Sequence, residues 1–225
     1  GRSLLYMTAR YVDIYKILDD ISKERKLTPE ERAEYKKYSK MADAFTPLAK
    51  GMNSEFANES AYDAIQVHGG SGFMLEYKCQ RIYRDARIMS IYEGTTQLQT
   101  VAAIRYITSG FYASIIQEYE QEPVAAEYES YAARIKDMAD KLNFCTNKAK
   151  EAGNQDFLDF CARKLYEMTA YTIMCHLLLQ DTQRAPELFS KSLVVFMNYA
   201  ESEVAKHFNY IHKLDADQLA SYVQE

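Results

Sequence analysis

The chain has 225 residues, of which 48% are hydrophobic and 26% charged, so a well-filled core is expected and wholesale disorder is excluded. The net charge is −5 and no basic block occurs, which argues against nucleic acid or an anionic membrane surface as the main partner. Only 8 Gly and 4 Pro are present, too few for the many turns of an all-β fold. We therefore predict an all-α protein.

The first two helices are predicted from apolar spacing and from a start signal. Apolar side chains recur at helical spacing over about residues 3–25, which predicts an amphipathic helix. Thr28 then serves as N-cap, Pro29 occupies the first helical position and Glu31 completes a capping box. We expect this second helix to reach about residue 52, with a kink or break at Pro47.

A third helix is predicted over Ala57–His68, and it should stop at the glycine-rich loop of residues 69–72. A short charged helix over Gln80–Met89 follows, and Glu93-Gly94 then forms a turn. Thr96 and Gln99 predict a capping box for a further helix that runs through about residue 108.

Beyond Gly110 the helical pattern restarts three times. Pro123 precedes a helix that ends near Gly153, Asn154 or the next residue opens another, and Pro186 opens the last. We predict two helical bundles that meet near residues 109–123, with domains over 1–110 and 111–225.

The cysteines and histidines do not predict a metal site or a disulfide framework. The cysteines contain no CxxC pair, and we expect them to be buried small side chains in a reducing compartment. The histidines lack ligand spacing, so packing or surface roles are expected. The longest apolar stretch, near residues 174–179, is far below the roughly 18 residues of a membrane span. The residues concerned are Cys79, Cys145, Cys161, Cys175, His176, His207 and His212.

Residues 66–105 hold the features that could support chemistry. The glycines of residues 69–72 free the backbone to approach a phosphate or a ring, although such a run is more often a helix C-cap. Four charged residues on consecutive helical turns more often form a structural salt-bridge network; they are Arg81, Arg84, Asp85 and Arg87. Glu93 precedes a helix N-terminus, where the helix dipole alone would favour an acid.

Three motifs occur in order within this window: QVHGGSGF at 66–73, RDARI at 84–88 and IYEGTTQLQ at 91–99. Together they resemble the C-terminal helical domain of acyl-CoA dehydrogenases, whose pattern is approximately Q-x-x-G-G-x-G-[FY], R-D-A-[RK]-I and I-Y-E-G-T-x-[EQ]-x-Q. The resemblance covers roughly residues 1–110. Residues 111–225 resemble the extra helical region of some larger bacterial and very-long-chain-type members.

The resemblance implies FAD-dependent dehydrogenation of an acyl-CoA to a trans-2-enoyl-CoA, as in fatty acid β-oxidation. It assigns to Glu93 the role of the base that removes the α-proton, while the β-hydride passes to the flavin. It places Gly94 close to the thioester and matches Arg105 to an arginine that we assign to substrate binding. Thr100 departs from the basic residue often found at its position, so an ionic contact there is not implied.

For the cofactor, the resemblance matches Thr95 and Gln97 to positions that contact FAD at the start of the last conserved helix. Gln66, Gly69 and Gly70 match a segment that reaches FAD across the subunit interface. A homodimer or homotetramer is therefore implied, with an electron-transferring flavoprotein as the electron acceptor. We expect no metal, no nucleic acid and no membrane span.

The N-terminal helical domain and middle β-domain of the family do not occur in these 225 residues, so we expect this chain alone to be inactive and the activity to belong to a longer parent. Three alternatives stay open: an acyl-CoA oxidase, a nucleic-acid-binding relative of the alkylation-response type, and a purely structural oligomerisation module. The expected compartment is the cytoplasm of a bacterium, or the mitochondrial matrix in a eukaryote.

Overall fold

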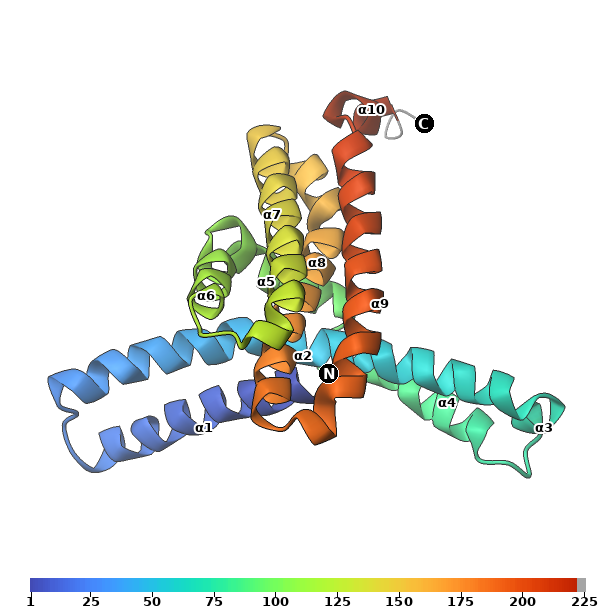
Figure 1. Ribbon diagram of the computed structural model, residues 1–225, viewed down its shortest axis with the longest axis horizontal. Coiled ribbons are helices and arrows are strands. Elements are labelled where there is room, and N and C mark those ends of the chain that lie inside the picture. Colours follow the sequence, from blue (N-terminus) through green and yellow to red (C-terminus); the bar gives the residue numbers. More distant parts are fainter. Residues whose placement is uncertain (222–225) are drawn as a thin grey trace. The chain divides into compact units, whose positions relative to one another are not determined.

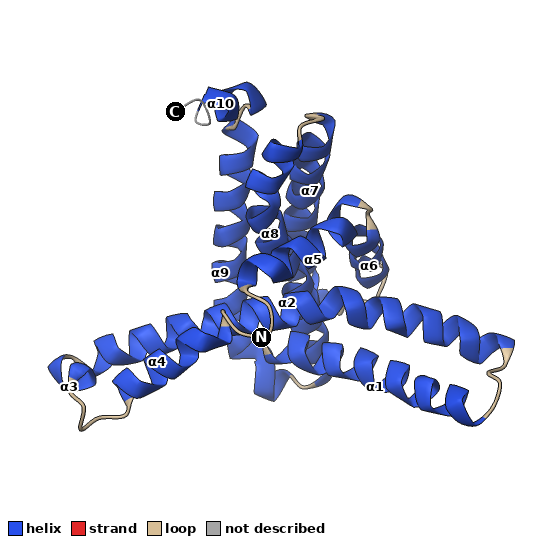
Figure 2. Cartoon of the chain, turned by 180° about the vertical axis from the view of Figure 1, so that it is seen from behind, coloured by secondary structure: helices blue, strands red, loops and turns tan. Residues whose placement is uncertain are grey.

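The computed structural model describes residues 1–221, and every regular element in them is helical (Figure 1). Figure 2 shows helices joined by loops and turns, without a strand in this part of the chain. The chain divides into two compact units, which we call the first unit (Gly1–Ala102) and the second unit (from Ala103 onward). The all-α prediction is confirmed. The predicted domain boundary at residue 110 stays a prediction.

The first unit is built on a long helical hairpin. It comprises α1 (Arg2–Glu24), α2 (Pro29–His68), α3 (Gly70–Phe73), α4 (Cys79–Met89) and the start of α5 (Thr96–Thr108). α1 packs along α2, and α4 returns along the second half of α2 (Figure 1). The Tyr11 ring meets the Phe45 ring edge-on, at 5.0 Å between centroids.

The predicted start of α2 is confirmed atom by atom. Thr28 Oγ1 accepts a hydrogen bond from the Glu31 amide at 3.2 Å, and Glu31 Oε2 accepts one from the Thr28 amide at 2.9 Å. Arg25 forms an ion pair with the same carboxylate at 2.6 Å. This contact and the Thr28 amide lower the pKa of Glu31 to about 2, so the capping box stays formed in mild acid.

Of the kink or break predicted at Pro47, a break is wrong, because α2 is one helix of 40 residues. The predicted end near residue 52 and the separate helix over Ala57–His68 are wrong for the same reason. Proline removes one backbone hydrogen bond and costs about 3 kcal/mol inside a helix. Here the turns around it are almost entirely buried: Phe45 and Leu48 are inaccessible to solvent, and Met52 is 2% exposed. Burying each such side chain contributes about 1.5–3 kcal/mol, so packing outweighs the lost hydrogen bond.

The glycine-rich segment after α2 is more ordered than the predicted loop. Gly69 has φ 58° and ends α2, and the next four residues form the single-turn helix α3. Gly72 is buried, and a Cβ there would lie 2.5 Å from the Ile65 carbonyl oxygen. Gly72 therefore allows α3 to pack directly on the last turns of α2, whereas a Cβ on Gly70 would meet nothing within 4 Å.

We predict that Gly72→Ala destabilises the first unit by about 1–3 kcal/mol, because its methyl group would push against a backbone carbonyl. Gly70→Ala should be neutral or stabilising by up to about 1 kcal/mol, since it occupies a helical position in open space. Urea unfolding of both variants checks this. A loss of stability in Gly70→Ala equal to that in Gly72→Ala would contradict the packing argument.

The second unit is a bundle in which α8 lies between its neighbours. It comprises the rest of α5, α6 (Phe111–Glu120), the 3-10 helix η1 (Ala126–Tyr128), α7 (Glu129–Glu151), α8 (Gln155–Arg184), α9 (Pro186–Lys213) and α10 (Ala216–Ser221). α8 packs on both α7 and α9, and α6 packs on α7 and α8. α8 is nearly continuously buried from residue 165 to 182, which makes it the centre of this core.

The helix starts predicted in this unit are confirmed. The Asn154 side chain accepts a hydrogen bond from the Phe157 amide at 3.2 Å, and Pro186 is the first residue of α9. Most of residues 109–123, where the two bundles were predicted to meet, forms a further helix, α6, that the three predicted restarts beyond Gly110 did not include. Tyr112, Ile115 and Ile116 are buried from this helix, at a spacing of three and four residues that indicates a helix.

Three of the four cysteines are buried, and all are free thiols. Burial raises the pKa of Cys145 and Cys175 to about 12, so these thiols stay protonated and unreactive. Among residues 1–221, no helix is both long and apolar enough to cross a bilayer.

His176 on α8 should make the stability of the second unit depend on pH. Burial lowers its pKa from 6.5 to about 4, so between these values the unfolded chain binds a proton that the folded chain does not. The free energy of unfolding should therefore fall as the pH drops from about 6.5 to about 4, by up to about 3 kcal/mol. His176→Phe should lose this dependence in urea unfolding series. An unchanged pH profile in the variant would contradict the assignment.

Candidate functional site

The segment between α4 and α5 is a strained turn that presents Glu93. Glu93 has φ 50° and Gly94 has φ 91°, and Glu93 is the one non-glycine residue with positive φ in the described part of the chain. A left-handed conformation at such a residue costs on the order of 1–2 kcal/mol. The Thr96 amide donates to the Ser90 carbonyl at 3.1 Å and closes the loop. Strain of this kind persists where the surroundings hold it, and it often marks a functional residue.

Contacts from α2 hold this turn in place. Lys50 Nζ donates a hydrogen bond to the Gly94 carbonyl oxygen at 2.5 Å, and Gln99 Nε2 donates to the same oxygen at 3.1 Å. Thr96 Oγ1 donates to Glu55 Oε1 at 2.5 Å. Two residues of α2 therefore hold the turn: Lys50 binds it at Gly94, and Glu55 binds Thr96 just after it.

The N-cap of α5 is Thr95, so the predicted capping box at Thr96 and Gln99 is wrong by one residue. Thr95 Oγ1 accepts a hydrogen bond from the Leu98 amide at 3.2 Å. Thr96 is instead the first helical residue and is buried, and its hydroxyl is used on Glu55. The Gln99 side chain donates a hydrogen bond to the Gly94 carbonyl oxygen and so helps to hold the turn.

Glu93 lies at the wall of a cavity of about 360 Å³ within the first unit. Lys50 and Tyr92 also line it, and the Lys50 ammonium lies 5.9 Å from the centre of the Tyr92 ring. The remaining walls come from α1, α2 and α4; they are Leu5, Thr8, Thr46, Ala49, Asn53, Ser54, Ala57 and Met89. A carboxylate beside a slot with aliphatic and thioether walls can remove a proton from an apolar substrate.

The structure brings some of the predicted site residues together and separates others. Glu93, Gly94 and Thr95 are consecutive, and Gln97 is exposed on the first turn of α5. Gln66, Gly69 and Gly70 are exposed at the far end of α2; Gln66 lies 16 residues beyond Lys50 on the same helix, or about 24 Å at the helical rise. Arg105 belongs to the second unit, where its guanidinium lies 5.0 Å from the Tyr106 ring.

The charged cluster on α4 does not form the salt-bridge network expected from the sequence. Within residues 1–221, none of Arg81, Arg84, Asp85 and Arg87 takes part in an ion pair, and all four are exposed. Arg87 instead donates a hydrogen bond to the Ser90 hydroxyl at the start of the turn. In the same part of the chain, no group of three His, Cys, Asp or Glu residues is arranged to hold a metal ion.

An extended apolar surface surrounds α3 and α4, and α4 buries none of its own residues. Large apolar side chains are more than 40% exposed along this stretch; they are Tyr62, Val67, Phe73, Met74, Leu75, Tyr77, Ile82, Ile88, Met89, Ile91 and Tyr92. Exposed apolar patches of this extent generally mark interaction surfaces.

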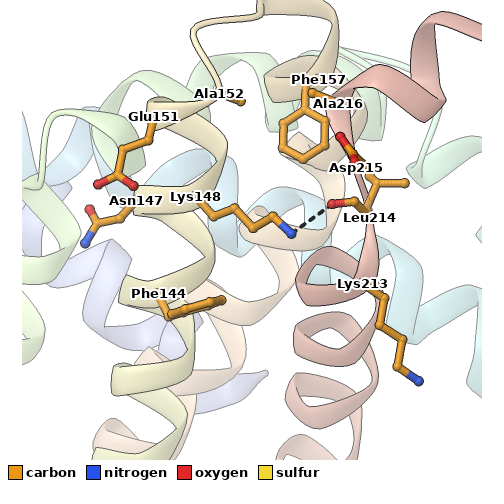
Figure 3. A pocket seen from close by; sticks show the side chains of 10 residues that line it. All are labelled: Phe144, Asn147, Lys148, Glu151, Ala152, Phe157, Lys213, Leu214, Asp215 and Ala216. Atoms are coloured by element: carbon orange, nitrogen blue, oxygen red, sulfur yellow. Dashed lines mark hydrogen bonds between the residues drawn. The ribbon is translucent and has the colours of Figure 1, made fainter.

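A cavity of about 820 Å³ in the second unit opens between the ends of α7 and α9 (Figure 3). The Lys148 side chain crosses this cavity, and its Nζ donates hydrogen bonds to the carbonyl oxygens of His212 at 2.7 Å and Leu214 at 2.8 Å. These carbonyls are the unpaired groups at the C-terminal end of α9, so Lys148 acts as a helix cap there. No residue predicted for the site lines this cavity.

The structure thus defines a helical domain with a carboxylate at the wall of a largely apolar cavity, and comparisons with known proteins define its family. The family described as "Acyl-CoA dehydrogenase, C-terminal domain" matches residues 24–107, and that described as "Acyl-CoA dehydrogenase C terminal" matches residues 108–219. The chain belongs to the acyl-CoA dehydrogenase family and comprises its C-terminal helical region.

Several curated proteins match part of the chain. Caffeyl-CoA reductase-Etf complex subunit CarC of Acetobacterium woodii is 52% identical over 52 residues, covering 23% of this chain and 14% of that protein. An acyl-CoA dehydrogenase of Bacillus subtilis is 40% identical over 63 residues, covering 28% and 17%. The 3-methylmercaptopropionyl-CoA dehydrogenase of Ruegeria pomeroyi is 51% identical over 59 residues, covering 26% and 10%. The chain thus spans less than a fifth of each relative.

A solved structure shares the fold over nearly the whole chain. The acyl-CoA dehydrogenase of Bacillus anthracis, solved in complex with FAD, aligns with a TM-score of 0.69 and 19% identity, covering 98% of this chain and 41% of that one. Both helical units therefore have a counterpart within one larger protein.

We predict that Lys50→Met loosens the turn that carries Glu93, because the Gly94 carbonyl loses its charged donor. Amide hydrogen exchange over residues 90–98 should accelerate by about tenfold, while α2 stays protected. Lys36→Met is the matched control, since Lys36 is exposed on the same helix. Equal exchange in the two variants would show that Lys50 does not hold the turn.

Proposed function

We propose that this chain is the C-terminal part of an FAD-dependent oxidoreductase of class EC 1.3, which removes two hydrogens from an acyl-CoA thioester and forms a trans-2-enoyl-CoA. The observation that carries the proposal is the position of Glu93, on a strained turn at the wall of an acyl-sized cavity. The motifs around it and the family membership support the same chemistry.

Glu93 is the base in this proposal. Its carboxylate takes the α-proton of the thioester, and the electron pair of that C–H bond becomes the second bond between the α- and β-carbons as the β-hydride departs. FAD, when bound, accepts that hydride and is thereby reduced. The thioester lies close to the backbone at Gly94, and Arg105 serves substrate binding. Lys50 fixes the turn and thereby holds Glu93 at the cavity wall.

The residues proposed for FAD suit contact with an anionic or carbonyl oxygen. The Gln97 amide, in the first turn of α5, has no acceptor among residues 1–221, whereas the neighbouring Thr96 and Leu98 amides both donate hydrogen bonds. Such a free amide favours phosphate or ring oxygens. At Gly69 and Gly70 a Cβ would meet nothing within 4 Å, so the backbone there is open to a ligand.

The separation along α2 supports a second subunit at the cofactor. Gln66, Gly69 and Gly70 lie about 24 Å or more from Lys50 on their own chain. At this distance they do not contact a flavin bound beside Glu93 of the same chain. We propose that they contact the FAD of a partner subunit in a homodimer or homotetramer. The apolar surface around α3 and α4 fits burial in that assembly.

The proposed electron acceptor is an electron-transferring flavoprotein. This follows the relative named as a subunit of a reductase-Etf complex. That relative and the 3-(aryl)acrylate reductase of Clostridium sporogenes, 45% identical over 58 residues, are named for reduction. The same residues serve either direction, since a protonated Glu93 can return the proton to the α-carbon.

The test is anaerobic reduction of the flavin in the longer enzyme that carries this chain. A panel of acyl-CoAs of different length and branching should bleach the flavin absorbance, and a matching enoyl-CoA should restore it. Glu93→Gln should bind FAD normally and bleach at least about a thousandfold more slowly, because the amide cannot accept the α-proton.

Glu120→Gln, at an exposed carboxylate of α6, is the matched control and should bleach at the wild-type rate. Equal bleaching in wild type and Glu93→Gln would mean that another residue is the base. No bleaching by any acyl-CoA would favour a relative that has lost the reaction. Fast reoxidation of the reduced flavin by oxygen alone would indicate an acyl-CoA oxidase.

A further inference from the structure

The second unit contains a cavity that the proposed reaction does not use. It has a volume of about 200 Å³ and lies between the end of α6, the start of α7 and the C-terminal half of α8. The Gln183 side chain accepts a hydrogen bond from the Ala125 amide at 2.9 Å and fixes the chain segment beside it. The volume corresponds to roughly seven waters at liquid density, which is enough for a ligand with a single ring.

Two polar side chains face this cavity without a partner. His176 and Gln180 lie one turn apart on α8, and they are only 6% and 9% exposed. Neither His176 Nε2 nor Gln180 Nε2 has a hydrogen-bond partner in the described residues. Buried polar groups are nearly always hydrogen-bonded, so this pair indicates a partner that the chain does not supply.

The chemistry of the pair restricts that partner. Gln180 Nε2 is a donor, whereas Nε2 of a neutral imidazole is a donor in one tautomer and an acceptor in the other. A hydroxyl satisfies both cases, because it can accept two hydrogen bonds or accept one and donate one. Burial lowers the pKa of His176 to about 4, so no positive charge is available here for an anion at neutral pH.

The remaining lining favours a neutral ring. Tyr119, Pro123, Val124 and Leu179 supply apolar wall, and the Tyr119 ring lies 5.7 Å from the His176 ring. The charged lining residues are Glu120, Glu122 and Lys136, and all of them are exposed. The cavity therefore offers no buried charge to pair with a charged ligand.

We propose that this cavity is a binding site for a small neutral aromatic alcohol, whose hydroxyl pairs with His176 and Gln180 and whose ring packs against Tyr119 and Leu179. The site lies wholly in the second unit and does not depend on the assignment of Glu93.

The test is isothermal titration calorimetry of the 225-residue chain at pH 7 with phenol, toluene and benzoate. Phenol should bind, toluene should bind more weakly, and benzoate should not bind. Gln180→Met should weaken phenol binding by about three- to tenfold, the value of one hydrogen bond, without weakening toluene binding. Gln117→Met, the same substitution at an exposed position on α6, should leave both unchanged.

His176→Phe provides a second variant if Gln180→Met fails to fold, and it should also weaken phenol selectively. The proposal is overturned if phenol produces no saturable heat, or if both variants bind phenol as tightly as the wild type. It is equally overturned if a crystal grown with saturating phenol shows only water molecules on His176 Nε2 and Gln180 Nε2.

Discussion

The hydrogen bond from Lys50 to the Gly94 carbonyl is the contact on which the candidate site depends. It joins the middle of the longest helix to a turn that would be costly on its own, because two successive residues have positive φ. Glu55, five residues further along α2, binds the first residue of the next helix, α5. Without these ties the turn could relax, and Glu93 would lose its fixed place at the cavity wall.

The second half of α2 links two regions of the candidate site. The part of α2 that follows Pro47 carries both Lys50 and Glu55, which support the Glu93 turn, and it ends at the glycine segment. Under the proposed function, these two regions serve different flavins in a symmetric assembly. The exposed apolar surface between them is then the surface that assembly covers.

Local signals in the sequence predicted much of the fold, and long-range packing explains most of the exceptions. Thr28 and Asn154 mark helix starts within four residues of chain, so they could be recognised without the structure. The helix continues through Pro47 because packing against α1 stabilises the turns around it. Such packing is a tertiary effect that the local sequence does not show. For the candidate site, the motif singles out Glu93 for the proposed role, but Lys50 lies 43 residues away and no local pattern connects the two.

The most direct test of this account is a double-mutant cycle between Lys50 and Glu93, measured as the rate of flavin reduction by a saturating acyl-CoA in the longer enzyme. If Lys50 acts by positioning the Glu93 carboxylate, Lys50→Met should slow reduction by about tenfold in the wild type but much less in a Glu93→Asp background, where the carboxylate is already displaced. An equal slowing in both backgrounds would contradict the account, because Lys50 would then act independently of the base.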